Sequence, residues 1–220
     1  MKTLTSRIAA ATVALGLCGA VSAAPVTWTD WTSATAGASM VIGTLDVNGT
    51  SVGVTFTGPY LFAQTAGGTN YWNPATPYQS SAVDNAPPAS DIIGLNAAGT
   101  ATIAFTQAVV DPLIALVSFN GNTVDFGVPI DILSYGSGYW GGGTPVLNAA
   151  GTGFFGNGEV HGVIRMPGTY NSISFTHTSE NWHGITVGVA GLAPSQVPEP
   201  ASLALVGLAL AGLAAVRRRR

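Results

Sequence analysis

The chain has 220 residues, of which 47% are hydrophobic and only 8% carry a charged side chain, and its formal net charge is −3 at pH 7. Between Ala24 and Gln196, nine acidic residues are accompanied by a single basic residue, Arg165. So acidic a surface repels phosphate backbones and anionic lipids, which excludes a nucleic-acid-binding function for this part of the chain.

Residues 1–23 predict a secretory signal peptide. Lys2 and Arg7 form a short basic opening, residues 8–21 are apolar, and small residues precede Ala24 at a position typical of signal-peptide cleavage. The apolar run is short for a membrane span. We therefore expect export by the general secretory route and a mature chain that begins at Ala24.

The single cysteine of the sequence, Cys18, lies inside this predicted signal peptide. Leu17 precedes it, where lipoprotein processing normally requires a small side chain, so lipidation is the lesser alternative. A mature chain that begins at Ala24 would contain no thiol, which excludes disulfides, thiolate catalysis and cysteine-ligated zinc. We expect packing and backbone hydrogen bonds to stabilise the fold instead.

Residues 24–196 are long enough for one domain with its own core, and their pattern predicts an all-β fold. Short runs rich in Val, Ile, Thr and aromatic residues are separated by Gly, Asn, Pro or Asp, and Asn48-Gly49 marks a two-residue hairpin turn. Many short strands at this spacing favour a single β-sandwich of jelly-roll-like type. The predicted strand regions cover residues 26–32, 44–57, 91–95, 100–106, 113–119, 129–135, 159–166, 171–177 and 183–189.

Four stretches of this region carry more specific signals. The run LIALVSF at 113–119 is continuously apolar, which is typical of a central strand. Residues 67–88 have no hydrophobic period and predict a long surface loop. The segments 136–143 and 151–158 both combine glycines with aromatic residues, and we expect two loops there rather than a structural repeat.

Glu159 and His161 are two residues apart on one predicted strand and so share a face, and His177, Glu180 and His183 follow at intervals of three. Carboxylate and neutral imidazole groups are ligands for zinc and other divalent ions. The spacing matches no established metal motif, so we expect these groups to make hydrogen bonds and predict no cofactor. The candidate ligands, should a metal bind, are Glu159, His161, His177 and His183.

Aromatic residues in glycine- or asparagine-rich segments suggest a carbohydrate contact. Flat rings exposed on a sandwich could stack on sugar faces, and large exposed apolar groups usually mark a contact surface. The alternative is that these rings cover the open ends of the core, which is the favoured interpretation for Trp140 and Trp182. The candidate contact residues are Tyr71, Trp72, Tyr139, Trp140 and Trp182.

No catalytic motif is recognisable in residues 24–196. A hydrolase needs a nucleophile with a base, or two carboxylates across a cleft, and neither a nucleophile elbow nor a Ser-His-Asp pattern marks such a site. Glu159 with Glu180 or Asp131 could form a glycosidase pair, although any domain with nine acids offers such pairs. We therefore expect a non-enzymatic protein, with a secreted glycan-acting hydrolase as the alternative.

The C-terminal residues 197–220 have three parts in a fixed order. Val197-Pro198-Glu199-Pro200 cannot continue a helix and holds the chain extended. The mostly apolar residues 201–216 would form a helix of roughly 24 Å, shorter than the roughly 30 Å of a hydrocarbon core. An arginine cluster then keeps this end of the helix in the cytoplasm. The cluster consists of Arg217, Arg218, Arg219 and Arg220.

The Pro198-Glu199-Pro200 triplet, the apolar helix and the arginine cluster together resemble the PEP-CTERM sorting signal of Gram-negative bacteria that make exopolysaccharide. The resemblance implies that an exosortase, an intramembrane cysteine peptidase, recognises residues 197–220 and cuts near the triplet. Residues 111–189 resemble, more weakly, the ectodomains of uncharacterised PEP-CTERM cargo, a resemblance that implies no activity. A permanently membrane-anchored surface binding domain is the alternative, although so short a helix anchors weakly.

The combined expectation is a secreted or surface protein that is tethered by its C-terminal helix, trimmed, and delivered to the cell envelope or the extracellular matrix. Its expected partners are the exosortase and, before processing, the membrane. Exopolysaccharide of a biofilm matrix is the further partner that weak carbohydrate contacts would serve.

Replacing all four terminal arginines by glutamine should prevent correct sorting, because the charge that holds the end of the helix in the cytoplasm is lost. We expect most of the clipped protein to disappear from the cell surface and the medium, as measured by immunoblots against residues 24–196 and against the tail. Lysine at the same four positions keeps the charge and should preserve sorting. Correctly clipped glutamine variant in unchanged yield would contradict the role of the arginines.

Overall fold

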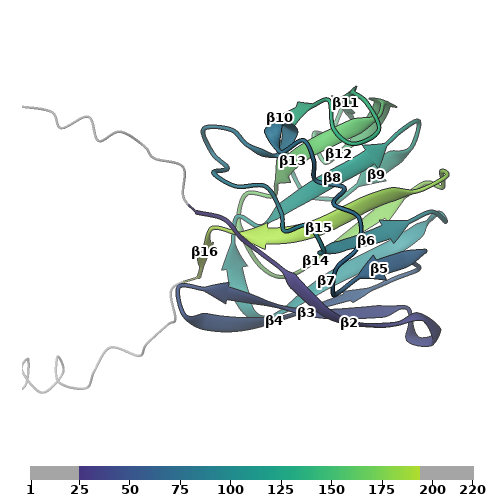
Figure 1. Cartoon of the computed structure of the whole chain (residues 1–220). Coiled ribbons are helices and arrows are strands. Elements are labelled where there is room, and N and C mark those ends of the chain that lie inside the picture. Colours follow the sequence, from purple (N-terminus) through teal and green to yellow (C-terminus); the bar gives the residue numbers. More distant parts are fainter. Residues whose placement is uncertain (1–24, 194–220) are drawn as a thin grey trace, which may run out of the picture.

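Residues 25–193, the part of the chain that the computed structural model describes, form two antiparallel sheets packed face to face (Figure 1). The predicted signal peptide at 1–23 and the predicted sorting segment at 197–220 lie outside the described residues. One sheet has seven strands and the other has nine. The expectation of an all-β sandwich is therefore confirmed.

The strands are short, as the spacing of turn residues in the sequence predicts, and two 3-10 turns interrupt them. In chain order the elements are β1 (Thr27–Trp28), β2 (Asp30–Thr35), η1 (Ala36–Ala38), β3 (Met40–Val47), β4 (Thr50–Thr57), β5 (Phe62–Gln64), η2 (Thr76–Tyr78), β6 (Ile92–Leu95), β7 (Gly99–Val110), β8 (Leu113–Phe119), β9 (Thr123–Asp125), β10 (Asp131–Gly136), β11 (Gly143–Leu147), β12 (Gly153–Gly158), β13 (Val160–Arg165), β14 (Thr169–His177), β15 (His183–Val189) and β16 (Gly191–Leu192). Within residues 25–193, no helix is long and apolar enough to cross a membrane.

The strand order is that of a jelly roll. In the centre of one sheet the order is β13-β8-β15-β6, and in the other it is β12-β9-β14-β7. The chain crosses from one sheet to the other between β6 and β7, between β8 and β9, and at each step from β12 to β15. Such alternation between two sheets of antiparallel strands is the jelly-roll arrangement, so the predicted type of sandwich is also found.

The main core lies between the two sheets and is built from alternating apolar positions. In β3 and β4, buried residues alternate with exposed or half-buried ones, and Asn48-Gly49 joins these strands with positive φ at both residues. Both features match the hairpin signal in the sequence. Trp31 is fully buried in this core, and its indole N–H donates to the Thr186 hydroxyl at 3.0 Å. This bond ties β2 of one sheet to β15 of the other.

A second apolar cluster lies on the outer face of the seven-stranded sheet. Trp72, Tyr78 and Val83 pack there against alternate side chains of β8, such as Ala115 and Val117. Because β8 is covered on both faces, all seven of its residues are buried, which confirms the predicted central strand. The prediction of a surface loop at 67–88 is wrong to this extent: the segment is irregular, but its large rings form a core of their own.

Two strands were missed where glycine-rich sequence predicted a loop. β11 and β12 pair with each other, and β12 also pairs with β9. Glycine normally weakens a strand, but a Cβ at Gly153 would lie 2.1 Å from the Val124 carbonyl oxygen, and one at Gly156 would lie 2.3 Å from the Phe119 carbonyl oxygen. These glycines are therefore required by the close approach of neighbouring backbones, which the sequence alone does not reveal.

The same close approach gives a stability prediction for Gly162 in β13. A Cβ at this position would lie 2.2 Å from the Ser134 carbonyl oxygen of β10, so Gly162→Ala must push the two strands apart. We expect the free energy of unfolding to fall by about 2 kcal/mol or more in denaturant titrations. Gly37→Ala, where no atom lies within 4 Å of the added Cβ, is the matched control and should change it little.

Candidate functional site

A cleft of about 350 Å³ opens at one end of the sandwich, where β8 ends and where β13 and β15 begin. Carboxylates, neutral hydrogen-bonding groups and two indole rings line it together. The lining residues are Ser118, Asn120, Trp140, Glu159, Glu180, Asn181 and Trp182.

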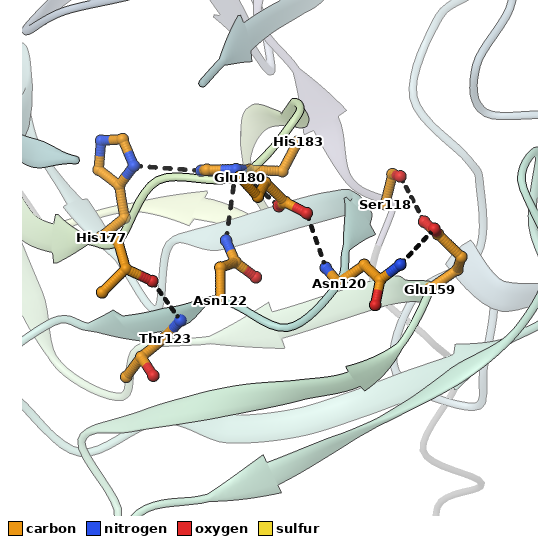
Figure 2. Close-up of polar contacts among 9 residues, drawn as sticks. Ser118, Asn120, Asn122, Thr123, Glu159, His177, Glu180 and His183 are labelled. Carbon is orange, nitrogen blue, oxygen red and sulfur yellow. Dashed lines mark hydrogen bonds and ion pairs between the residues drawn. The ribbon is translucent and has the colours of Figure 1, made fainter. Parts of the chain in front are cut away.

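A β-bulge directs Ser118 toward this cleft. Leu116 pairs with Gly162 and Phe119 pairs with Val160, so two residues of β8 face one residue of β13. Ser118 has φ of 60°, a left-handed conformation that costs a non-glycine residue roughly 1 kcal/mol. As a result its hydroxyl donates to Oε2 of Glu159, just before β13 (Figure 2).

Glu159 is held by two neutral donors. Besides the Ser118 hydroxyl on Oε2, the side-chain amide of Asn120 donates to Oε1 at 2.7 Å. Hydrogen bonds to both oxygens fix the orientation of the carboxylate. Glu159 therefore presents an oriented anionic group at the cleft.

Glu180 lies next to Glu159 in a different environment. Its side chain is only 10% exposed, Oε1 lies 2.8 Å from Nδ1 of His183, and Oε2 accepts the backbone N–H of Asn120 at 3.1 Å. The pKa of Glu180 is raised to about 8: burial is the main cause, the Asn120 N–H partly opposes the shift, and the nearby charge of Glu159 adds to it. Glu180 is thus largely protonated at neutral pH.

Two histidines continue the chain of contacts into the core. Nε2 of His183 lies 3.2 Å from Nδ1 of His177, and Asn122 lies 3.3 Å from Nδ1 of His183 (Figure 2). Burial lowers the pKa of both histidines to about 4, so both rings are neutral at pH 7. The contact between Nδ1 of His183 and Oε1 of Glu180 is therefore a close approach of two neutral groups rather than an ion pair. We call this connected set the polar row: Ser118, Glu159, Asn120, Glu180, His183, His177 and Asn122.

Aromatic rings form a wall beside the polar row. Trp140 is 53% exposed and lies edge-on to Tyr139, with ring centroids 5.0 Å apart. Tyr71 contacts both Tyr139 and Trp182 at 5.1 and 5.0 Å, and Trp182 packs on Phe62 at 5.4 Å. The rings brace one another, which leaves the face of Trp140 open to a ligand.

The structure brings together many, but not all, of the residues singled out in the sequence. Four of the five candidate sugar contacts lie in the aromatic wall, but Trp72 is only 2% exposed and is unavailable to a ligand, so that prediction is corrected. The interpretation of Trp140 as a cover of the core is wrong because its ring is half exposed, whereas Trp182 is partly buried against Phe62.

The candidate metal ligands are distributed over two places. Glu159, His177 and His183 belong to the polar row, but His161 lies apart, with Nδ1 3.1 Å from the Tyr78 hydroxyl, and burial lowers its pKa to about 4. Among residues 25–193, no group of three or more His, Cys, Asp or Glu side chains is arranged to hold a metal ion.

Four polar residues of the site were missed by sequence reasoning. Ser118 lies near the end of β8, Asn120 and Asn122 follow that strand, and Asn181 lies between Glu180 and Trp182. Serine and asparagine after a strand usually form turns. One signal in the sequence could have identified these residues. The apolar run of the central strand ends in SFNGN, and so many hydrogen-bonding side chains in a row place several polar groups at one end of the sheet.

The comparisons identify one segment of the chain. Residues 196–220 match the family model described as the PEP-CTERM protein-sorting motif, which supports the predicted recognition of the C-terminal segment. No curated protein and no solved structure matched the chain.

The protonated state of Glu180 predicts a specific pH dependence of stability. The folded-state pKa of about 8 exceeds the ordinary value of 4.5, so Glu180 contributes stability below pH 4.5 that is lost as the pH rises through 8. Glu180→Gln cannot ionise, and its melting temperature relative to wild type should therefore be higher at pH 9 than at pH 5. Calorimetric scans at the two pH values measure this; a difference that does not change with pH contradicts it.

Proposed function

We propose that this exported, exosortase-sorted protein binds neutral polysaccharide of the extracellular matrix in the cleft between Trp140 and Glu159. The observation that supports the proposal is the half-exposed ring of Trp140 beside a set of oriented hydrogen-bonding groups. A large ring that is left open to solvent in a cleft, although its neighbours pack tightly, is typical of a contact surface.

The chemistry of the cleft suits a sugar. Pyranose rings present an apolar face, which stacks on an aromatic ring, and hydroxyl groups, which both donate and accept hydrogen bonds. Trp140 and Trp182 offer the aromatic surface. The side-chain amides of Asn120 and Asn181 can donate and accept hydrogen bonds. The Glu159 carboxylate supplies strong acceptors.

Charge selects among the glycans of a matrix. Arg165, the single basic residue between Ala24 and Gln196, pairs with Asp131 at 2.6 Å, so within residues 25–193 no lysine or arginine is left to neutralise the other eight acids. The ectodomain therefore repels uronic acids and other anionic sugars. We expect neutral polysaccharide to be the ligand.

The placement of the cleft fits a protein that is first tethered at its C-terminus. β15 begins beside the cleft at His183 and ends at Val189, and the described chain leaves the sandwich at Ala193, near β16 (Figure 1). Seven residues of strand separate the two ends by about 20 Å. The cleft thus opens at the end of the sandwich opposite Ala193, where it is free to meet polysaccharide.

Trp140→Ala should weaken glycan binding without weakening the fold, because this ring is half exposed and stacks only on Tyr139. We expect the affinity for neutral exopolysaccharide, measured from retardation of the protein in native gels, to fall about tenfold, which corresponds to about 1.4 kcal/mol and lies within the roughly 0.5–1.5 kcal/mol typical of an aromatic contact.

Phe155→Ala is the matched control for this variant, since Phe155 is 44% exposed on β12 and does not line the cleft. Its retardation should equal that of wild type. Equal loss of retardation in both variants, or no retardation of wild type with neutral exopolysaccharide, would overturn the proposed function.

A further inference from the structure

We propose that the cleft hydrolyses the glycosidic bonds of the polysaccharide that it binds, with Glu180 as the general acid and Glu159 as the general base. The inference rests on the proposed function, because hydrolysis requires a glycan in the cleft. It reverses the expectation of a non-enzymatic protein in favour of the hydrolase alternative.

The carboxyl groups of Glu159 and Glu180 both form hydrogen bonds with one residue, Asn120. The backbone N–H of Asn120 meets Oε2 of Glu180, and its side-chain amide meets Oε1 of Glu159 (Figure 2). Both groups line the same cleft. Two carboxyl groups that flank a bound sugar are the arrangement by which most glycoside hydrolases act.

The two groups differ in the way that an acid and a base must differ. Glu159 lines the cleft and accepts hydrogen bonds on both oxygens, from Ser118 and Asn120. Glu180 has a side chain that is nine-tenths buried between Glu159 and neutral His183. Environments that push two neighbouring carboxyl groups apart in pKa identify the proton donor and the proton acceptor.

The acid proton can reach the substrate from one oxygen of Glu180. Oε1 of Glu180 lies against Nδ1 of buried His183 at 2.8 Å, away from the cleft. Oε2 is the oxygen directed toward Asn120 and Glu159 (Figure 2). Proton transfer to the sugar therefore proceeds from Oε2 in the proposed reaction.

The proposed step conserves atoms and charge. Glu180 transfers its proton to the glycosidic oxygen as the bond from that oxygen to the anomeric carbon breaks. A water molecule forms the new bond to the anomeric carbon, and Glu159 takes the proton that this water loses. The products are two shorter glycans, one of them with a new reducing end, and proton exchange with solvent restores both carboxyl groups.

The aromatic wall gives the second, independent reason to place a sugar at these groups. Trp140 and Trp182 line the cleft together with both carboxyl groups. Rings braced by Tyr71 and Tyr139 hold their position, and binding energy from stacking can fix the scissile bond beside Glu180. A merely structural pair of buried acids would need no such exposed ring.

The test uses the exported protein isolated from the cells that produce it and neutral exopolysaccharide whose reducing ends have been removed with borohydride. We expect new reducing ends to accumulate with wild type, at a rate that falls as the pH rises through about 8, because Glu180 then loses its proton. Glu180→Gln and Glu159→Gln should each lower the rate by about 10²–10⁴-fold, a far larger loss than either causes in gel retardation by the polysaccharide. Asp30→Asn, an exposed acid of β2 that does not line the cleft, is the matched control and should keep the wild-type rate.

The outcomes separate the two proposals. Retardation of wild type without any new reducing ends between pH 5 and 9 overturns hydrolysis and leaves the proposed binding function intact. If the polysaccharide does not retard the wild-type protein at all, both the binding function and the hydrolysis are overturned. New reducing ends that appear at equal rates with wild type and with either glutamine variant, each folded by its melting temperature, show that other residues carry the reaction and overturn the assigned roles.

Discussion

The burial of β8 on both faces is the constraint on which the rest of the structure depends. Its outer side chains need a second apolar layer, and the segment that contains Trp72 and Tyr78 supplies it. That segment also carries Tyr71 to the side of Trp182, where it braces the aromatic wall. A sheet covered on both faces therefore explains both the position of an irregular segment and the rigidity of the rings at the cleft.

The same strand determines the polar chemistry at its end. Once β8 leaves the apolar layers, a bulge turns Ser118 out of register and the next residues meet Glu159 and Glu180. Burial of a carboxyl group disfavours its charge, and the neighbouring anion adds to the effect, so Glu180 holds its proton. The site thus combines an oriented carboxylate, a protonated carboxyl group and exposed aromatic rings. Within residues 25–193, the fold around it contains few ion pairs that could stabilise it.

Export and sorting place this chemistry in a coherent setting. Residues 25–193 contain no cysteine and are strongly acidic, so they depend on two packed apolar layers and on backbone hydrogen bonds for their stability. The PEP-CTERM motif at 196–220 implies processing by an exosortase, and the cleft lies where β13 and β15 begin, at the other end of the sandwich from Ala193. A matrix glycan can approach the cleft from that end.

The sequence by itself determined the features that depend on local order: the sorting segment, the hairpin at Asn48-Gly49, and the central strand at 113–119. Alternation of apolar residues and turn chemistry act over a few residues and can be recognised without a fold. Only the tertiary structure decided three properties. Two glycines of β12 are needed because neighbouring backbones approach them closely, Trp72 is buried while Trp140 is half exposed, and Glu180 keeps its proton at neutral pH. Those properties depend on residues that are distant in the sequence. Their spacing along the chain does not reveal which of them come into contact, bury one another or lie close enough for their charges to interact.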